Sequence, residues 1–219
     1  MATRMANVTG PHGAGGGVST QRDDRLMRQT VAEPEQLANL SKEKAQLLEI
    51  IKRKSLLRGS FTLASGATSN YYLDMKRAMF DPQGASLIAE IVYQMLQGEP
   101  DVDSIGGLEL GAVPIVSIVV ARSWHGRPLS GFVVRKEKKG HGTDKQIDGN
   151  FTPNTNVVLI DDVTTKGGSV LQAVHAVRAR GATVKKIITV VDRQEGAEEN
   201  LKKEGLILLP IFTTQDLLR

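Results

Sequence analysis

The chain has 219 residues, of which 40% are hydrophobic and 24% are charged, a balance typical of a globular protein with one well-buried core. It contains no cysteine, which excludes disulfides, thiol nucleophiles and cysteine-ligated metals, and no apolar run approaches the roughly 20 residues of a membrane helix. The net charge of +4 and the aromatic content of 4% favour anionic small molecules as ligands over single-stranded nucleic acid. Because the lack of cysteine also fits a reducing compartment, we predict a cytoplasmic protein that binds neither nucleic acid nor membrane.

Residues 1–38 differ in composition from the rest of the chain. The glycine-rich run Gly10–Gly17 is unsuited to a helix or a strand, and large apolar residues are sparse in this segment. The first acidic residue is Asp23, so the segment begins basic, as transit peptides do, but no apolar core of a secretory signal follows Arg4. We predict a disordered N-terminal extension over residues 1–38 and a single folded domain over residues 39–219.

The first part of this domain is predicted to contain two helices and a strand pair. Ser41 is a candidate N-cap for the first helix. Short strands are expected at Phe61–Leu63 and Tyr71–Leu73, on either side of a turn at Ser65–Gly66. Asp81–Pro82 supplies an N-cap and a first helical residue for the second helix.

From residue 103 onwards, strands and helices are expected to alternate. The expected strands are Asp103–Gly107, Ser130–Val134, Val157–Asp161, Lys186–Val191 and Leu206–Pro210, and the expected helices are Pro114–Ser123, Ser169–Arg180 and Ala197–Lys203. This alternation predicts an α/β fold, a Rossmann-like parallel sheet flanked by helices with right-handed crossovers. One basic, glycine-containing connection, residues 135–155, is longer than ordinary loops, and we predict that it is a flexible loop that closes over an anionic ligand.

The segment around Asp161 and Asp162 carries the clearest chemical signal. The two adjacent carboxylates end a strand with four consecutive apolar residues, and Thr164–Ser169 then supplies hydroxyls and glycines directly before a helix. Backbone N–H groups at a helix N-terminus bind phosphate, and carboxylates beside them suit hydroxyl groups or a hydrated divalent cation. The segment therefore predicts a sugar-phosphate site. Taken alone, two adjacent acids could also cap a turn, and a lysine-rich loop could be a solvated surface.

Four segments together resemble a known family. Residues 157–169 are similar to the phosphoribosyl pyrophosphate signature of type I phosphoribosyltransferases, with departures at Thr164 and Lys166. Three further segments resemble orotate phosphoribosyltransferases in order and spacing: the hood segment Phe61–Asp74, the catalytic-loop segment Arg135–Gly142, and the segment after the next strand, Val191–Glu195. The resemblance covers residues 41–215 and implies the type I phosphoribosyltransferase fold. It also implies a small N-terminal hood over residues 41–80 and a long mobile catalytic loop.

The resemblance implies a reaction as well as a fold. Members of this family transfer the phosphoribosyl group of phosphoribosyl pyrophosphate to N1 of orotate, forming orotidine 5′-monophosphate and pyrophosphate in de novo pyrimidine (UMP) biosynthesis. They use Mg²⁺, which is expected to be held mainly by the substrate, with contacts through water to Asp161 and Asp162 and no direct protein ligand. They form homodimers in which the basic loop enters the partner's site. The alternatives are a purine phosphoribosyltransferase and a regulator that keeps the fold.

The resemblance assigns a role to individual residues. Lys139, Asp162 and His141 are expected to be catalytic, and Tyr72, Leu73, Thr165 and Arg193 to bind orotate. The residues expected to bind phosphoribosyl pyrophosphate are Leu110, Gly111, Arg135, Lys136, Lys139, His141, Asp161, Asp162, Val163, Thr164, Thr165, Lys166, Gly167, Gly168 and Ser169. Without the resemblance, an ion pair with Glu195 would be the preferred interpretation of Arg193.

Two departures concern the charge of the site. Well-known bacterial members carry lysine where this chain has Ala64 and Gly111. Because the leaving pyrophosphate needs cations around it, we hypothesise that Lys76 or Arg77, which follow the hood strand closely, replaces one of these lysines.

Overall fold

The structure is a computed structural model that describes residues 34–62, 68–137 and 146–219. These residues belong to one compact unit, Glu33–Arg219. The remaining parts of the predicted extension, of the hood and of the basic loop lie outside the described residues. None of the helices in the described ranges has the length and apolar character that a membrane span requires.

The described residues form seven helices and eight strands. The helices are α1 Pro34–Lys54, α2 Lys76–Met79, α3 Pro82–Leu96, α4 Ala112–Ser123, α5 Gly168–Arg178, α6 Ala197–Lys203 and α7 Thr214–Leu218. The strands are β1 Leu56–Thr62, β2 Thr68–Leu73, β3 Ser104–Leu108, β4 Ser130–Val134, β5 Ile147–Gly149, β6 Asn156–Thr164, β7 Thr183–Asp192 and β8 Leu208–Thr213.

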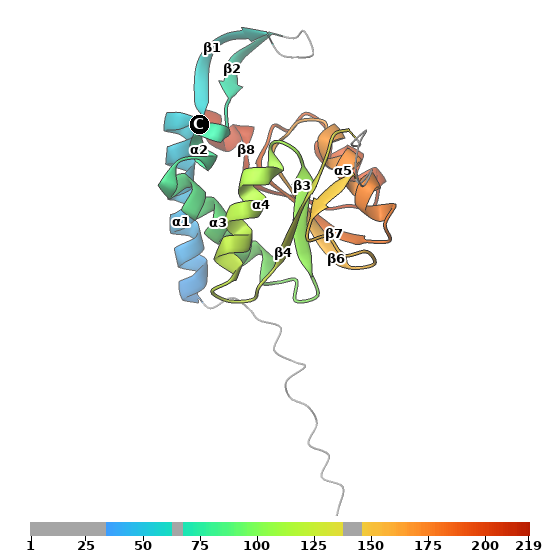
Figure 1. Ribbon diagram of the computed structural model, residues 1–219. Coiled ribbons are helices and arrows are strands. Elements are labelled where there is room, and N and C mark those ends of the chain that lie inside the picture. Colours follow the sequence, from blue (N-terminus) through green and yellow to red (C-terminus); the bar gives the residue numbers. More distant parts are fainter. Residues whose placement is uncertain (1–33, 63–67, 138–145) are drawn as a thin grey trace, which may run out of the picture. The chain divides into compact units, whose positions relative to one another are not determined.

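The main sheet has six strands in the order β5-β4-β3-β6-β7-β8, and all neighbours are parallel except the pair of β4 and β5. Helices lie on both of its faces, while β1 and β2 form a separate antiparallel pair (Figure 1). The predicted α/β fold with a parallel sheet is therefore confirmed.

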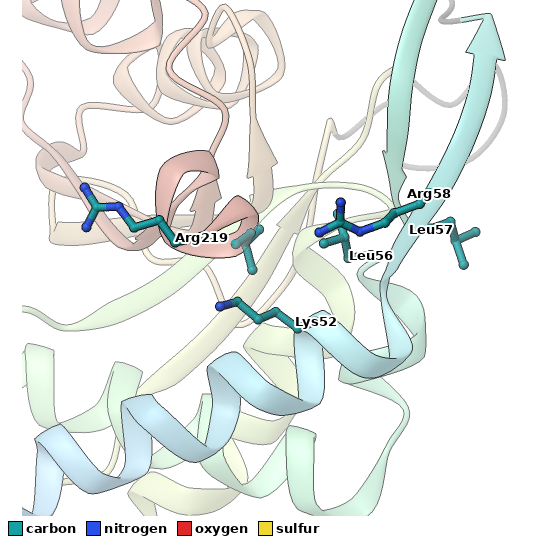
Figure 2. A pocket seen from close by; sticks show the side chains of 6 residues that line it. Lys52, Leu56, Leu57, Arg58 and Arg219 are labelled. Atoms are coloured by element: carbon teal, nitrogen blue, oxygen red, sulfur yellow. The ribbon is translucent and has the colours of Figure 1, made fainter.

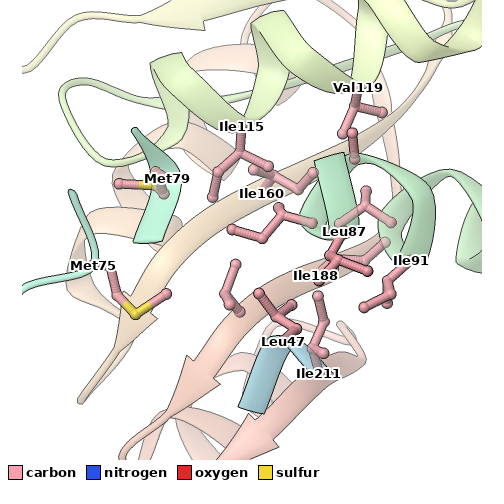
Figure 3. Close-up of a cluster of buried hydrophobic side chains, with 14 of the residues drawn as sticks. Leu47, Met75, Met79, Leu87, Ile91, Ile115, Val119, Ile160, Ile188 and Ile211 are labelled. Carbon is pink, nitrogen blue, oxygen red and sulfur yellow. The ribbon is translucent and has the colours of Figure 1, made fainter. Parts of the chain in front are cut away.

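Two clusters of buried side chains form the core, one on each face of the sheet. The first lies under α1, α3 and α4 (Figure 3), and the second under α5 and α6. Successive side chains of a strand alternate between faces. In β6, Val158 and Ile160 accordingly belong to the first cluster, and Val157 and Leu159 to the second.

Local signals predicted the start of one helix correctly and of another wrongly. Asp81 is the N-cap of α3 and accepts a hydrogen bond from the Gly84 N–H at 2.9 Å, as predicted. The N-cap assigned to Ser41 is wrong, because α1 already begins at Pro34 and the Ser41 hydroxyl donates to the Leu37 carbonyl one turn earlier, at 2.9 Å. Proline is favoured in the first helical turn, and a serine inside a helix commonly bonds back in this way.

Other boundaries differ because tertiary pairing extends the elements. Strand β6 continues past the predicted end at Asp161 as far as Thr164, which pairs with Asp192 of β7. Strand β5 lies within the predicted loop of residues 135–155 and pairs with β4. The sequence analysis also missed the short helices α2 and α7. Elements of three to five residues have too few periodic positions to be recognised from sequence.

Candidate active site

Four chain segments meet at the carboxyl edge of the sheet. The carboxyl ends of parallel strands lie at one edge, and open α/β sheets bind ligands there. The predicted site residues at these ends are Gly111 after β3, Lys136 after β4, Asp161 and Asp162 in β6, and Arg193 after β7. Hydrogen bonds join the segments: the Lys136 N–H donates to Glu109 Oε1 at 3.1 Å, and the Arg193 N–H to the Thr164 carbonyl at 2.9 Å. The fold therefore gathers these residues into one site.

The carboxylates of Asp161 and Asp162 lie at the centre of this edge. Asp161 is 8% exposed, and its Oδ1 accepts a hydrogen bond from the Asp162 N–H at 3.0 Å. Burial, and then the neighbouring charge of Asp162, raises the pKa of Asp161 to about 8. Burial also raises the pKa of Asp162, although the Val163 N–H donates to its Oδ1 at 2.9 Å and opposes the rise. A cation bound here would favour the ionised forms.

The loop from Thr165 to Ser169 has the geometry expected of a phosphate site. Gly167 has φ +80°, in the left-handed region that favours glycine, and no side chain caps the helix α5 that follows. The first backbone N–H groups of this helix have no partner within it, so they remain available to an anion. Thr164 is placed differently, because it ends β6 at 1% exposure and its hydroxyl has no partner among the described residues.

Beside the carboxylates, the turn between β3 and α4 leaves almost no space at Gly111. A Cβ on Gly111 would be 2.3 Å from Asp162 Oδ1, far inside van der Waals contact. A pocket of about 490 Å³ opens next to this glycine. It is lined by Lys76, Met79, Phe80, Leu110, Gly111, Val113, Pro114, Ser117, Ile118 and Asp162.

Arg193 lies at the opposite side of the carboxylates, under the strand pair. Its guanidinium is 5.0 Å from the centre of the Tyr71 ring, within the range of a cation–π contact. Its Nε is 2.8 Å from Glu195 Oε1, yet this buried N–H is not aligned for a hydrogen bond, so the contact is an ion pair only. The sequence analysis missed Tyr71. Tyr71 and Tyr72 are consecutive residues of a strand, so their side chains face opposite ways. This alternation was the one sequence signal that a single tyrosine of the pair would face the site.

The sequence of this chain matches a known protein family. The phosphoribosyl transferase domain family matches residues 78–211. The orotate phosphoribosyltransferase of Bradyrhizobium sp. strain BTAi1 is 43% identical over 183 residues, which cover 81% of this chain and 98% of that protein. The chain belongs to the orotate phosphoribosyltransferase family.

An archaeal relative and a solved structure extend the match. The orotate phosphoribosyltransferase of Methanocaldococcus jannaschii is 43% identical over 179 residues, covering 80% of this chain and 97% of that protein. The crystal structure of Mycobacterium tuberculosis orotate phosphoribosyltransferase in complex with phosphoribosyl pyrophosphate superposes with a TM-score of 0.69 at 35% identity, covering 81% of this chain and 99% of that one. The predicted family is therefore confirmed, together with its fold.

The other predicted orotate contacts of the family occupy different environments. Tyr72 is 41% exposed and its ring centre is 5.7 Å from that of Phe61, so it presents a surface to solvent. Leu73 is buried in the first core cluster. Thr165 is exposed in the phosphate loop.

The basic-loop residues that the family resemblance singles out are only partly described. Arg135 forms an ion pair with Asp148 of β5, and its N–H donates to the Gln146 carbonyl at 2.9 Å. The Lys136 carbonyl accepts a hydrogen bond from Gln172 Nε2 of α5 at 2.7 Å. The predicted catalytic residues Lys139 and His141, like Ala64 of the hood, lie outside the described residues.

A second pocket, of about 460 Å³ and with a basic lining, is found at the end of α1. It is lined by Lys52, Leu56, Leu57, Arg58, Leu217 and Arg219 (Figure 2). None of the residues that the resemblance to orotate phosphoribosyltransferases assigned to the site lines it. We therefore place the candidate active site at the carboxyl edge of the sheet.

Proposed function

We propose that the protein transfers the phosphoribosyl group of phosphoribosyl pyrophosphate to N1 of orotate, forming orotidine 5′-monophosphate and pyrophosphate in UMP synthesis. Relatives named orotate phosphoribosyltransferase, 43% identical over most of the chain, support this activity. The observation that carries the proposal is the convergence of the carboxylate pair, the phosphate loop and Arg193 at one edge of the sheet.

In this proposal, phosphoribosyl pyrophosphate lies across the carboxyl end of β6. The uncapped N-terminus of α5 and the loop Thr165–Ser169 bind the 5′-phosphate, because their N–H groups and the helix dipole favour an anion. Asp161 and Asp162 accept hydrogen bonds from the ribose hydroxyls. The related M. tuberculosis enzyme has been crystallised with this substrate, which supports a site of the same kind here.

Orotate binds between the strand pair and Arg193. A guanidinium forms two parallel hydrogen bonds with a carboxylate, so Arg193 suits the orotate carboxylate. The Tyr71 ring faces Arg193, so its neighbour Tyr72 faces away from it, and the Leu73 side chain is buried in the core. We therefore propose that Tyr72 and Leu73 contact orotate through their backbone, and that exposed Thr165 completes the contacts.

Catalysis depends on charge more than on a nucleophile. As pyrophosphate leaves, it gains negative charge while the ribose carbon becomes cation-like, so cations and N–H donors aimed at pyrophosphate lower the barrier. We assign this role to Arg135, Lys136, Lys139 and His141, with Lys139 as the main catalytic cation. Mg²⁺ bound to the substrate would supply further positive charge, and buried Asp161 and partly buried Asp162 would contact it through water.

We further propose a homodimer in which the basic loop of each subunit completes the site of its partner, and a cytoplasmic location. The family resemblance supports the dimer. The absence of cysteine is in keeping with a reducing compartment.

The decisive experiment follows the absorbance of orotate in the presence of phosphoribosyl pyrophosphate and Mg²⁺. We expect orotate to be consumed, and adenine, hypoxanthine and uracil to be left unchanged. Consumption of a purine base instead would assign the protein to the purine branch. Binding of phosphoribosyl pyrophosphate without turnover of any base would favour a regulator.

A further inference from the structure

The carboxylates of Asp161 and Asp162 lie together beside the turn that follows β3. A Cβ on Gly111 would be 2.3 Å from Asp162 Oδ1 and 3.1 Å from Asp161 Oδ1. Of the two residues, Asp162 lines the pocket that opens next to Gly111. The described basic residues assigned so far to pyrophosphate, Arg135 and Lys136, do not line this pocket, so a cation there comes from another element.

Among the described residues, Lys76 is the cation that lines this pocket. It is the first residue of α2 and lines the pocket that also contains Gly111 and Asp162. Burial raises the pKa of Asp162, and the positive charge of Lys76 acts in the opposite direction. The neighbouring Arg77 is placed elsewhere, because its Nη1 donates to the Lys54 carbonyl at 3.4 Å.

The ammonium of Lys76 is only loosely held by the protein. Its Nζ is 3.6 Å from Asp74 Oδ1, beyond hydrogen-bonding distance, and that oxygen has no hydrogen-bond partner among the described residues. The side chain of Lys76 is 57% exposed. Three N–H donors at the mouth of the pocket are thus free to turn towards a bound anion.

Position 111 cannot itself supply a cation in this geometry. A Cβ there would collide with Asp162 Oδ1, which the Val163 N–H holds in place. The strand order β3-β6-β7 also separates the two sides of the site: Gly111 and the Lys76 pocket lie on the β3 side, whereas Arg193 lies on the β7 side. If Arg193 binds orotate, the β3 side is left for the other substituent of the ribose carbon, the pyrophosphate.

We infer that Lys76 binds the pyrophosphate group of phosphoribosyl pyrophosphate beside Gly111. The inference rests on the proposed function. During transfer, the bond between C1′ and the pyrophosphate oxygen breaks and its electron pair stays on pyrophosphate. The bond between N1 of orotate and C1′ forms, and the N1 proton is released to water. Lys76 stabilises the negative charge that pyrophosphate gains, as a compact ammonium does for phosphate oxygens.

The test compares Lys76→Ala with Arg77→Ala, a neighbouring surface cation outside the pocket. The first readout is calorimetric binding of inorganic pyrophosphate with Mg²⁺ to the free protein. Loss of a hydrogen bond to a charged group corresponds to an affinity at least about tenfold weaker for Lys76→Ala. We expect Arg77→Ala to stay within about twofold of wild type, and Lys76→Arg to recover part of the loss because it keeps the charge.

Steady-state kinetics supply the second readout. We expect KM for phosphoribosyl pyrophosphate to rise in Lys76→Ala while KM for orotate stays close to wild type. Unchanged pyrophosphate affinity in a folded Lys76→Ala protein overturns the inference, as does an equal loss in Arg77→Ala. Failure of the proposed function is recognised separately: wild-type protein would then bind pyrophosphate in a Lys76-dependent manner but leave orotate unconsumed.

Discussion

The backbone of Gly111 lies directly against the carboxylate of Asp162. A Cβ at this position would be 2.3 Å from Asp162 Oδ1 and 3.1 Å from Asp161 Oδ1, so the turn after β3 can approach the carboxylates only because it has no side chain there. Since Asp162 Oδ1 also accepts the Val163 N–H, the carboxylate cannot withdraw without losing that bond. The close approach joins the β3 turn to the proposed ribose site.

Gly111→Ala should therefore damage the site. We expect kcat/KM for phosphoribosyl pyrophosphate to fall at least about tenfold and the free energy of unfolding to fall by about 1–3 kcal/mol, the usual range for overpacking. Gly98→Ala is the matched control, because a Cβ there meets nothing within 4 Å. Wild-type kinetics in Gly111→Ala would show that the carboxylates move freely.

Gly168→Ala should separate ligand binding from stability. A Cβ at Gly168 meets nothing within 4 Å, so we expect the free energy of unfolding to change by less than about 0.5 kcal/mol. Gly168 is the first residue of α5, so we expect the added methyl group to crowd a 5′-phosphate bound at this helix N-terminus. We expect weaker binding of phosphoribosyl pyrophosphate, measured by calorimetry. Unchanged affinity for phosphoribosyl pyrophosphate would show that the 5′-phosphate does not bind next to Gly168.

The raised pKa of Asp161 predicts a pH dependence of stability. Its pKa is about 8 in the folded protein, against about 3.9 in an unfolded chain. Between these values the folded state binds a proton that the unfolded state lacks, so this group makes the free energy of unfolding fall as pH rises from about 4 to about 8. Asp161→Asn removes this contribution.

Urea denaturation in metal-free buffer at the two ends of this window tests that expectation. We expect the free energy of unfolding of Asp161→Asn, taken relative to that of wild type, to be higher at the basic end than at the acidic end. The expected difference is at least about 1.4 kcal/mol, the equivalent of one pKa unit. Parallel pH profiles of the two proteins would contradict a raised pKa at Asp161.

Tyr71 should hold Arg193 in place for orotate. The ring lies 5.0 Å from the guanidinium, a contact worth about 0.5–2 kcal/mol depending on solvent exposure. We expect Tyr71→Leu to raise KM for orotate about three- to tenfold without a matching rise for phosphoribosyl pyrophosphate, and Tyr71→Phe, which keeps the ring, to behave almost as wild type. Equal effects of the two substitutions would argue against the ring contact.

The proposed shared site predicts complementation between two inactive variants. Lys139→Ala removes a residue that we assign to the partner's site, and Asp162→Asn removes one from the subunit's own site. Random mixing should restore about a quarter of the wild-type activity, because half of the dimers contain one intact site. Mixed dimers, confirmed by tag-based co-purification, that remain inactive would place both residues in the same subunit's site.

Several features of this protein could be predicted from local sequence because their physical causes are local. The apolar run of β6, the adjacent carboxylates and the glycines before α5 depend on neighbours in the chain, and so does the Asp81 cap of α3. Alternating strands and helices likewise determine a parallel sheet, whose carboxyl edge must then hold the loops that follow its strands.

The remaining features depend on contacts between residues that are distant in the sequence. Only the assembled structure places Tyr71 over Arg193 and brings Lys76 rather than Arg77 to the pocket beside Asp162. Strand β5 exists because β4 offers it an edge. The raised pKa of Asp161 requires burial by the whole sheet edge, a property of packing that no stretch of sequence contains. The sequence therefore determined the family, whereas tertiary packing decided which cation lies in the pocket beside Asp162 and which ring contacts Arg193.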